Sequence, residues 1–196
     1  MYKSIPLISL VLILLPFCGS SQTLEELNEK RYGLTQKGMI VLGSWAITNI
    51  TLSPILANQA SGANKYFHQM NGYWNGVNLL IAGFGYFTAR QANAKELSLT
   101  ESLKAQRRLE RALLFNTGLD LAYIVSGLYL QERSESTQTN ADRLDGFGRS
   151  LVLQGAFLFA FDLTFYLFQK KYGDKLLRLV DALAIGPAGV KLSWKL

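Results

Sequence analysis

Two aspartates stand within the most apolar stretches of the chain, where a carboxylate is costly. Asp120 lies in the apolar run 112–130, and Asp162 lies in the apolar run 151–168. A carboxylate near the middle of a membrane-spanning helix can hold an ion, bind a ligand or relay protons, and it can also lock neighbouring helices in register. The structural role is the interpretation we favour, with a ligand or ion site second and proton chemistry third.

A second set of polar side chains follows one face of a helix expected from Tyr66 onward. No Asp, Glu, Lys or Arg occurs again until Arg90, yet asparagines and small residues recur at alternating steps of three and four. This spacing places them on one narrow stripe. An unpaired amide in hydrocarbon costs several kcal/mol, so the stripe must find partners inside a bundle. The candidate polar centre comprises these side chains and the polar groups expected to meet them: Asn49, His68, Asn71, Asn75, Asn78, Asn116, Asp120, Gln154 and Asp162.

We expect both aspartates to share one buried cluster with Asn49, Asn75 and Asn78. Asn49 and the aspartates lie near the middle of their apolar runs, whereas Asn75 and Asn78 lie nearer to the loop between the first two runs. The amides of that stripe should therefore reach the carboxylates from the mouth of the bundle.

The sequence offers little material for catalysis or for metal binding. His68 is the only histidine and Cys18 the only cysteine, which excludes most transition-metal sites and any bis-histidine haem. No nucleophile and base stand together, and the pair Gly83 and Gly85 lacks the rest of a dinucleotide-binding pattern. His68 is best explained as a hydrogen-bonded packing residue. We expect no cofactor and no metal. A non-enzymatic protein is a simpler interpretation of this sequence than an enzyme.

Composition indicates a small helical membrane protein of one domain. Of the 196 residues 49% are hydrophobic and only 17% are charged, and the charges are bunched between long uncharged runs. The net charge of +6 raises the possibility of nucleic acid, but the basic residues flank hydrophobic spans, where lipid phosphate is the better partner. No nucleic-acid module is visible, so membrane lipids are the expected partners and nucleic acid is not.

Residues 1–21 have the plan of a secretory signal peptide. Lys3 supplies a positive start, 5–17 an apolar core, and small residues precede an expected cut ahead of Gln22. Cys18 raises the alternative of a lipoprotein signal, but large residues stand where that signal needs small ones. Ordinary cleavage is the interpretation we favour over lipidation or retention as an anchor.

The rest of the chain divides into an amphipathic segment over 22–37, a membrane domain over 38–170 and a tail over 171–196. Thr23 opens the first segment as a helix cap, Gly33 is expected to close it, and Pro54 to mark the far end of the first span. Ser98 begins a capping box, from which one long third helix should project from the membrane. Trp45, Tyr73 and Trp74 are interpreted as interfacial anchors. The expected spans are about 39–56, 73–89, 112–130 and 151–168.

The tail differs in kind from the helices before it. Residues 175–184 fit a short surface helix, 186–189 a turn, and 190–196 alternate apolar and polar side chains as a strand does. The predicted fold class is therefore all-α, a bundle of four transmembrane helices with a projecting third helix and a short β-like C-terminal tail.

Two cues to orientation conflict. Removal of a signal peptide leaves the new N-terminus outside the cytoplasm and places the loop 134–140 inside. Lys and Arg instead concentrate before the first span, between the second and third, and in the tail, which predicts the reverse orientation. We follow the signal peptide, or else the exported chain settles in an envelope membrane other than the inner one.

The stretches 38–46, 66–75, 116–123 and 154–162 resemble an uncharacterised family of small bacterial envelope membrane proteins. The resemblance extends over most of the chain after the signal. It implies four helices and a bacterial cell envelope, with the inner membrane first, and it brings no activity.

The expected function is that of a structural or accessory component of an envelope complex, with a protein partner or a second copy of the chain. The alternative is a binding or transport protein for a small polar ligand or a lipid that uses the Asn and Asp centre. A membrane enzyme ranks third.

Overall fold

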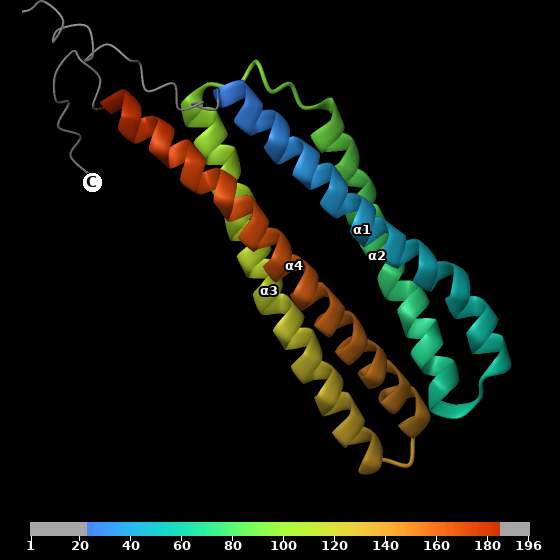
Figure 1. The fold of residues 1–196 in the computed structure, drawn as a ribbon. Coiled ribbons are helices and arrows are strands. Elements are labelled where there is room, and N and C mark those ends of the chain that lie inside the picture. The colour runs from blue at the N-terminus through green and yellow to red at the C-terminus, as the bar shows by residue number, and fades with distance from the viewer. Residues whose placement is uncertain (1–22, 185–196) are drawn as a thin grey trace, which may run out of the picture.

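The computed structural model describes residues 23–184, and within them every element is a helix (Figure 1). Two-residue and five-residue turns join the helices pairwise into two hairpins, and the longer segment 92–98 connects the hairpins at the opposite end. The four helices are α1 (Leu24–Gln59), α2 (Gly62–Gln91), α3 (Leu99–Glu135) and α4 (Ala141–Ala184).

Local signals explain where the helices begin. The Thr23 hydroxyl accepts from the amide of Glu26 at the start of α1. At the start of α3, the Ser98 hydroxyl accepts from the amide of Glu101, and the Glu101 carboxylate accepts from the amide of Ser98. The predicted capping box at Ser98 is therefore confirmed. Asn140, with φ of 62°, turns the chain into α4 in the left-handed conformation that asparagine tolerates.

One expected helix end does not occur. Gly33 lies inside α1, which continues to Gln59, and Pro54 lies five residues before that end. The helix continues through Gly33 because the residues before it are buried against the start of α3, and this packing stabilises the helix there. As a result, 22–37 is no separate segment within the described residues. The surface helix expected over 175–184 is likewise the end of α4.

The hairpin of α3 and α4 is closed by a seam of glycines. A Cβ placed on Gly127 would lie 2.6 Å from the backbone oxygen of Gly148, and one placed on Gly155 would lie 2.8 Å from the backbone oxygen of Asp120. Only glycine permits so close an approach of two helix backbones. In the other hairpin Gly72 meets Ser53 of α1, while Gly76 has open space around its Cα.

The two hairpins join mainly through α4. α2 packs along α4 and α1 touches α4 more lightly, whereas α2 and α3 meet through side chains such as Trp74 and Tyr123 and are not closely packed. A small core of Leu42, Ala82 and Leu158 lies at the junction, with Phe157 and Phe161 packed against it.

Large apolar side chains lie on the outside of all four helices, as in a membrane protein. Leu80 and Phe84 of α2 are 72% and 80% exposed, and α1, α3 and α4 carry many further exposed apolar residues. Three helices are long and apolar enough to cross a membrane: α1, α3 and α4 up to Asp181. Four spans were expected from the sequence. α2 is not among the three helices, because its inward-facing asparagines lower its mean hydropathy.

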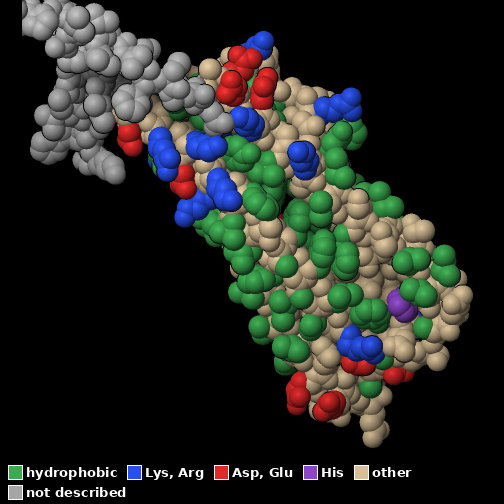
Figure 2. Space-filling model, viewed as in Figure 1, with side chains coloured by type: hydrophobic (Ala, Val, Ile, Leu, Met, Phe, Trp, Pro, Cys, Tyr) green, Lys and Arg blue, Asp and Glu red, His purple; other side chains and the backbone are tan. Residues whose placement is uncertain are grey.

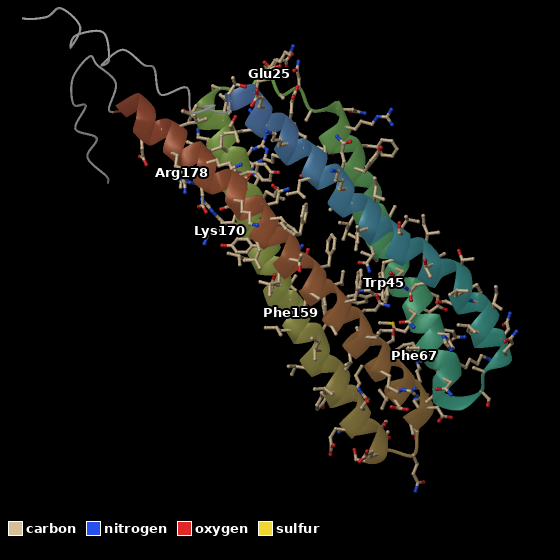
Figure 3. The ribbon with its side chains drawn as sticks, in the orientation of Figure 1. Glu25, Trp45, Phe67, Phe159, Lys170 and Arg178 are labelled. Atoms are coloured by element: carbon tan, nitrogen blue, oxygen red, sulfur yellow. The ribbon has the colours of Figure 1, made fainter. Side chains whose placement is uncertain are left out.

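Charged residues gather at both ends of the molecule and are more numerous at the end that carries segment 92–98, while the middle is nearly free of them (Figure 2). Lys170 and Arg178 of α4 and Glu25 of α1 belong to this end (Figure 3). We call it the charged end. The expected signal peptide over 1–21 and the β-like part of the tail, 185–196, lie outside the described residues.

Candidate functional site

A buried chain of hydrogen bonds crosses the junction between the hairpins, centred on Asn71 of α2. The Asn71 Oδ1 accepts from Ser150 Oγ at 2.6 Å and from Gln154 Nε2 at 3.0 Å, both on α4. The Gln154 Oε1 accepts in turn from Trp45 Nε1 of α1 at 3.0 Å, and the Trp45 ring stacks on Phe157. Three helices are thus tied together by groups that satisfy one another, which is what a structural lock requires.

The remaining amides of the α2 stripe extend this chain toward the centre. Asn75 donates to the backbone oxygen of Asn71 at 2.8 Å, and Asn78 donates to Asn75 Oδ1 at 3.3 Å. All three asparagines are buried. Asn49 and His68 do not join: Asn49 donates to the backbone oxygen of Trp45 on its own helix, and the His68 ring lies 5.1 Å from that of Phe67.

The two aspartates meet on the other hairpin. Asp120 of α3 and Asp162 of α4 are 3% and 7% exposed, and the Asp162 carboxyl contacts both the Asp120 carboxyl and the side chain of Asn116. We call these three residues the carboxyl cluster. Ionised carboxylates only accept hydrogen bonds, so neither can satisfy the other unless a proton or a cation lies between them.

A cavity of about 350 Å³ separates the carboxyl cluster from α2. All four helices contribute to its wall, and Asn78 is the one asparagine of the α2 stripe that reaches it. Apart from Thr35, the rest of the wall is apolar or aromatic, and it contains no Lys, Arg or His. Its volume is at the lower end of the range of roughly 300–1,000 Å³ typical of small-molecule pockets. The principal wall residues are Leu42, Trp74, Asn78, Ile81, Leu113, Asn116, Asp120, Tyr123, Leu158, Phe161 and Asp162.

Two wall residues carry buried polar atoms without a partner among residues 23–184. The Asp120 Oδ2 has no donor, and the Trp74 Nε1 has no acceptor. The Trp74 ring meets Tyr123 of α3 edge to face, with 4.7 Å between ring centroids. Since native proteins rarely leave such atoms unpaired, an unsatisfied acceptor and an unsatisfied donor on one cavity point to a ligand.

The candidate residues were expected to form one cluster. In the structure they fall into two sets. Asn71, Asn75 and Gln154 belong to the hydrogen-bonded chain, while Asp120, Asp162 and Asn116 form the carboxyl cluster, with Asn78 between the two sets.

The tryptophans were missed by the sequence analysis. Trp45 and Trp74 were interpreted as interfacial anchors, whereas Trp45 ends the hydrogen-bonded chain and Trp74 lines the cavity. Their position was the available signal, because Trp45 lies eight residues inside the uncharged run that starts after Lys37.

The charged end holds a second buried polar layer that the sequence analysis also missed. Asn28 Nδ2 donates to Ser102 Oγ at 2.9 Å, and Arg31 Nη1 donates to the backbone oxygen of Ser102 at 3.1 Å. Gln106 Nε2 donates to the backbone oxygen of Gln169 at 2.7 Å, and Gln169 Nε2 donates to Thr35 Oγ1 at 3.0 Å. The steps of three and four among polar residues of α1 were the signal for this layer.

No group of three His, Cys, Asp or Glu side chains between residues 23 and 184 is arranged to hold a metal ion. The carboxyl cluster supplies two carboxylates and one amide, a set suited to a proton, an ammonium group or another small cation.

Comparison with known proteins places the chain in a family without assigning an activity. No curated protein and no solved structure matches it. A family model matches residues 41–163, more than half of the chain, and these include the hydrogen-bonded chain, the carboxyl cluster and most of the cavity wall. The chain therefore belongs to DUF6992, a family of unknown function.

Proposed function

We propose that this protein is an integral membrane protein whose four helices all cross the bilayer and whose central cavity binds an amphiphile that carries an amine. The observation that carries the proposal is the carboxyl cluster on the wall of an otherwise apolar cavity, with the Asp120 Oδ2 buried and without a donor.

The lengths of the uncharged runs support the membrane part of the proposal. Residues 112–131 of α3 and 150–169 of α4 each span twenty residues in which the only charged side chain is one aspartate. Twenty helical residues measure about 30 Å, the thickness of the hydrocarbon core. In these runs Asp120 is the ninth residue from the charged end and Asp162 the eighth, so antiparallel helices bring both carboxyls to the same depth.

The geometry of α2 supports a fourth crossing. α2 runs back along α1 from a two-residue turn, so it shares whatever environment surrounds α1. Its amides face inward, and Leu80 and Phe84 face outward. One basic residue marks the same boundary on each helix: Lys37 on α1, Arg90 on α2, Arg111 on α3 and Lys170 on α4.

The chemistry of the wall favours a cationic ligand group over a neutral or an anionic one. Two carboxyls share one small volume, and no basic side chain lines it. An ammonium group offers several donors and a positive charge, so it can satisfy Asp120 Oδ2 and offset the second carboxylate. A ligand oxygen next to the ammonium nitrogen would accept a hydrogen bond from Trp74 Nε1. The apolar remainder of the wall suits a hydrocarbon body.

The cavity also has a route for such a ligand. Because α2 and α3 are not closely packed, side chains such as Trp74 and Tyr123 close the wall between them. Side chains rotate far more readily than packed helices separate. We therefore propose that the ligand enters sideways from the bilayer, between α2 and α3.

A ligand series of constant chain length tests the proposal. The full chain is purified in a non-ionic detergent, and its melting temperature is measured with n-octylamine, 1-octanol and octanoate. We expect octylamine to act at the lowest concentration and octanoate not at all. Saturation at 100 times Kd adds about 2.7 kcal/mol, or a rise of roughly 5–10 °C.

Two aspartate variants provide the matched comparison for this series. Asp120→Asn should lose the preference for octylamine, while Asp174→Asn, an exposed aspartate on the same helix as Asp162, should keep it. Equal stabilisation by octanoate, or an unchanged preference in Asp120→Asn, would contradict an amine site.

Membrane integration has its own test, because it can hold even if no amine binds. After carbonate extraction the protein should remain in the membrane pellet. Recovery in the soluble fraction would refute it. Three further statements remain predictions from the sequence: a place in the bacterial envelope, a cytoplasmic 134–140 turn, and an accessory role with a protein partner. Co-purification from a mild detergent extract tests the accessory role.

A further inference from the structure

Arg31 is a buried cation without a counter-ion in the described part of the chain. It is 3% exposed; its Nη1 donates to the backbone oxygen of Ser102 at 3.1 Å, and its Nη2 has no partner. The guanidinium carbon lies 4.7 Å from the centroid of the Tyr32 ring. No carboxylate of residues 23–184 lies within ion-pair distance of it. A buried charge that lacks a partner is strongly unfavourable, so this site favours an anionic ligand group.

Arg31 lines a second cavity, of about 600 Å³, that adjoins the central one. The two cavities share Thr35, Ile81, Gly85 and Leu109. Arg31 is the only charged residue on the wall of the second cavity, and most of the others are apolar, including Phe84 and Ala89 of α2 and Ala105 of α3. A single guanidinium at one end of an apolar chamber matches an amphiphile with an anionic head.

The position of the chamber favours a lipid. Ile81 and Phe84 lie within the uncharged run of α2, while Arg31 lies six residues before Lys37, on the aqueous side of the proposed boundary. The chamber therefore crosses from the hydrocarbon depth to the headgroup depth, about 9 Å farther along α1. An Arg fork suits the two oxygens of a phosphate. Basic residues cluster at this end of the molecule, which raises the local concentration of anionic lipid.

We propose that Arg31 binds the phosphate of a membrane phospholipid whose acyl chain fills the chamber between α2 and α3. This second site is independent of the amine site, because it uses a cation at the boundary and not the carboxyl cluster at mid-depth. The lipid would fill the gap that these two helices leave at this end. It would also complete the wall that α2 and α3 do not form together.

The test compares two lipids that differ only in the head. The full chain in non-ionic detergent is titrated with phosphatidylglycerol or with diacylglycerol of the same chains, and binding is followed by native mass spectrometry and by melting temperature. We expect phosphatidylglycerol to bind at least about tenfold more tightly. Equal binding of diacylglycerol would overturn recognition of the phosphate.

Three variants locate the site. Arg31→Met should weaken phosphatidylglycerol binding by about tenfold, and Arg178→Met, an exposed arginine on α4, should not weaken it. Ala105→Phe fills the chamber from an exposed rim position and leaves Arg31 in the chain, so it should block the lipid even if Arg31→Met fails to fold. Unchanged binding in either Arg31→Met or Ala105→Phe would overturn the proposal.

Inorganic phosphate separates a lipid site from a site for a free anion. We expect phosphate alone to leave the melting temperature unchanged, because it gains no chain contacts in the chamber. Stabilisation by phosphate as large as that by phosphatidylglycerol would overturn the lipid assignment.

Discussion

Substitution of the aspartates in the carboxyl cluster separates a structural from a binding role. Asp120→Asn replaces one acceptor by an amide that donates to the Asp162 carboxyl, and it removes one of two charges at mid-depth. A hydrogen bond to a charged group contributes about 1.5–3 kcal/mol. We therefore expect the melting temperature in detergent to stay unchanged or to rise. Each kcal/mol gained in the free energy of unfolding should raise it by about 2–4 °C.

Leucine at the same positions should act in the opposite direction and unequally. The Asp162 carboxyl contacts both Asp120 and Asn116, whereas Asp120 contacts only Asp162 within the cluster. Asp162→Leu therefore leaves two groups without a partner and should cost about 1–3 kcal/mol. Asp120→Leu leaves one, and it should cost less.

Thermal melts of the Asn and Leu variants, beside Asp174→Leu as an exposed control, provide the measurement. A melting curve of Asp162→Leu that matches the wild type would show that the aspartates are not buried together. If Asp120→Asn destabilises the protein as much as Asp120→Leu, the site requires a negative charge, and a bound cation must hold the cluster together even in the purified protein.

Further predictions concern the helix contacts. Gly155→Ala should lower the free energy of unfolding by about 1–3 kcal/mol, because the new Cβ would overlap a backbone oxygen of α3. Gly118 has open space around it, so Gly118→Ala should instead stabilise the protein by up to about 1 kcal/mol in the same thermal melts. Gln154→Leu should cost about 1–3 kcal/mol, because the half-buried indole N–H of Trp45 and the amide oxygen of Asn71 would each lose a hydrogen bond; an unchanged melting temperature would refute the lock. Hydrogen bonds from Ser98 lower the pKa of Glu101 below 4.5. The stability that they add is complete above about pH 4.5 and is lost as the pH falls through the folded value. Hydrogen exchange at the start of α3 should show that loss, and Glu101→Gln should abolish it.

Periodicity predicted most of the buried polar residues, since a helix face is fixed by steps of three and four, but Asn116 of the same candidate set is exposed and Asn49 and His68 are half-buried. Asn71, Asn75, Asn78, Asp120 and Asp162 are all buried as their spacing indicated. Periodicity does not fix which helices face each other, so the amides and the carboxylates were merged into one cluster.

Local sequence rules failed where tertiary contacts override them. Glycine ends helices in many proteins, but Gly33 remains inside α1. Asn49 was expected in the cluster because of its depth, yet its amide donates to the backbone oxygen of Trp45 on its own helix. The spacing of Asn28, Arg31 and Thr35 indicates a polar face of α1, but it does not identify Ser102, more than seventy residues later in the chain, as the partner of Arg31.

Hydrogen-bond satisfaction distinguishes the two kinds of polar group in this protein. The chain from Trp45 to Asn71 lies at the junction where the hairpins pack, and its cross-helix bonds are made. Six described side chains keep unpartnered buried atoms: Asp120, Trp74 and Arg31 line the cavities on the side where α2 and α3 are not closely packed, whereas Asn28, Gln106 and Gln169 lie in the polar layer at the charged end. Packing at the junction already fixes the register of the helices, so the unsatisfied groups of the cavities add nothing to it. Their cost is explained if each is satisfied by a molecule that enters from the bilayer.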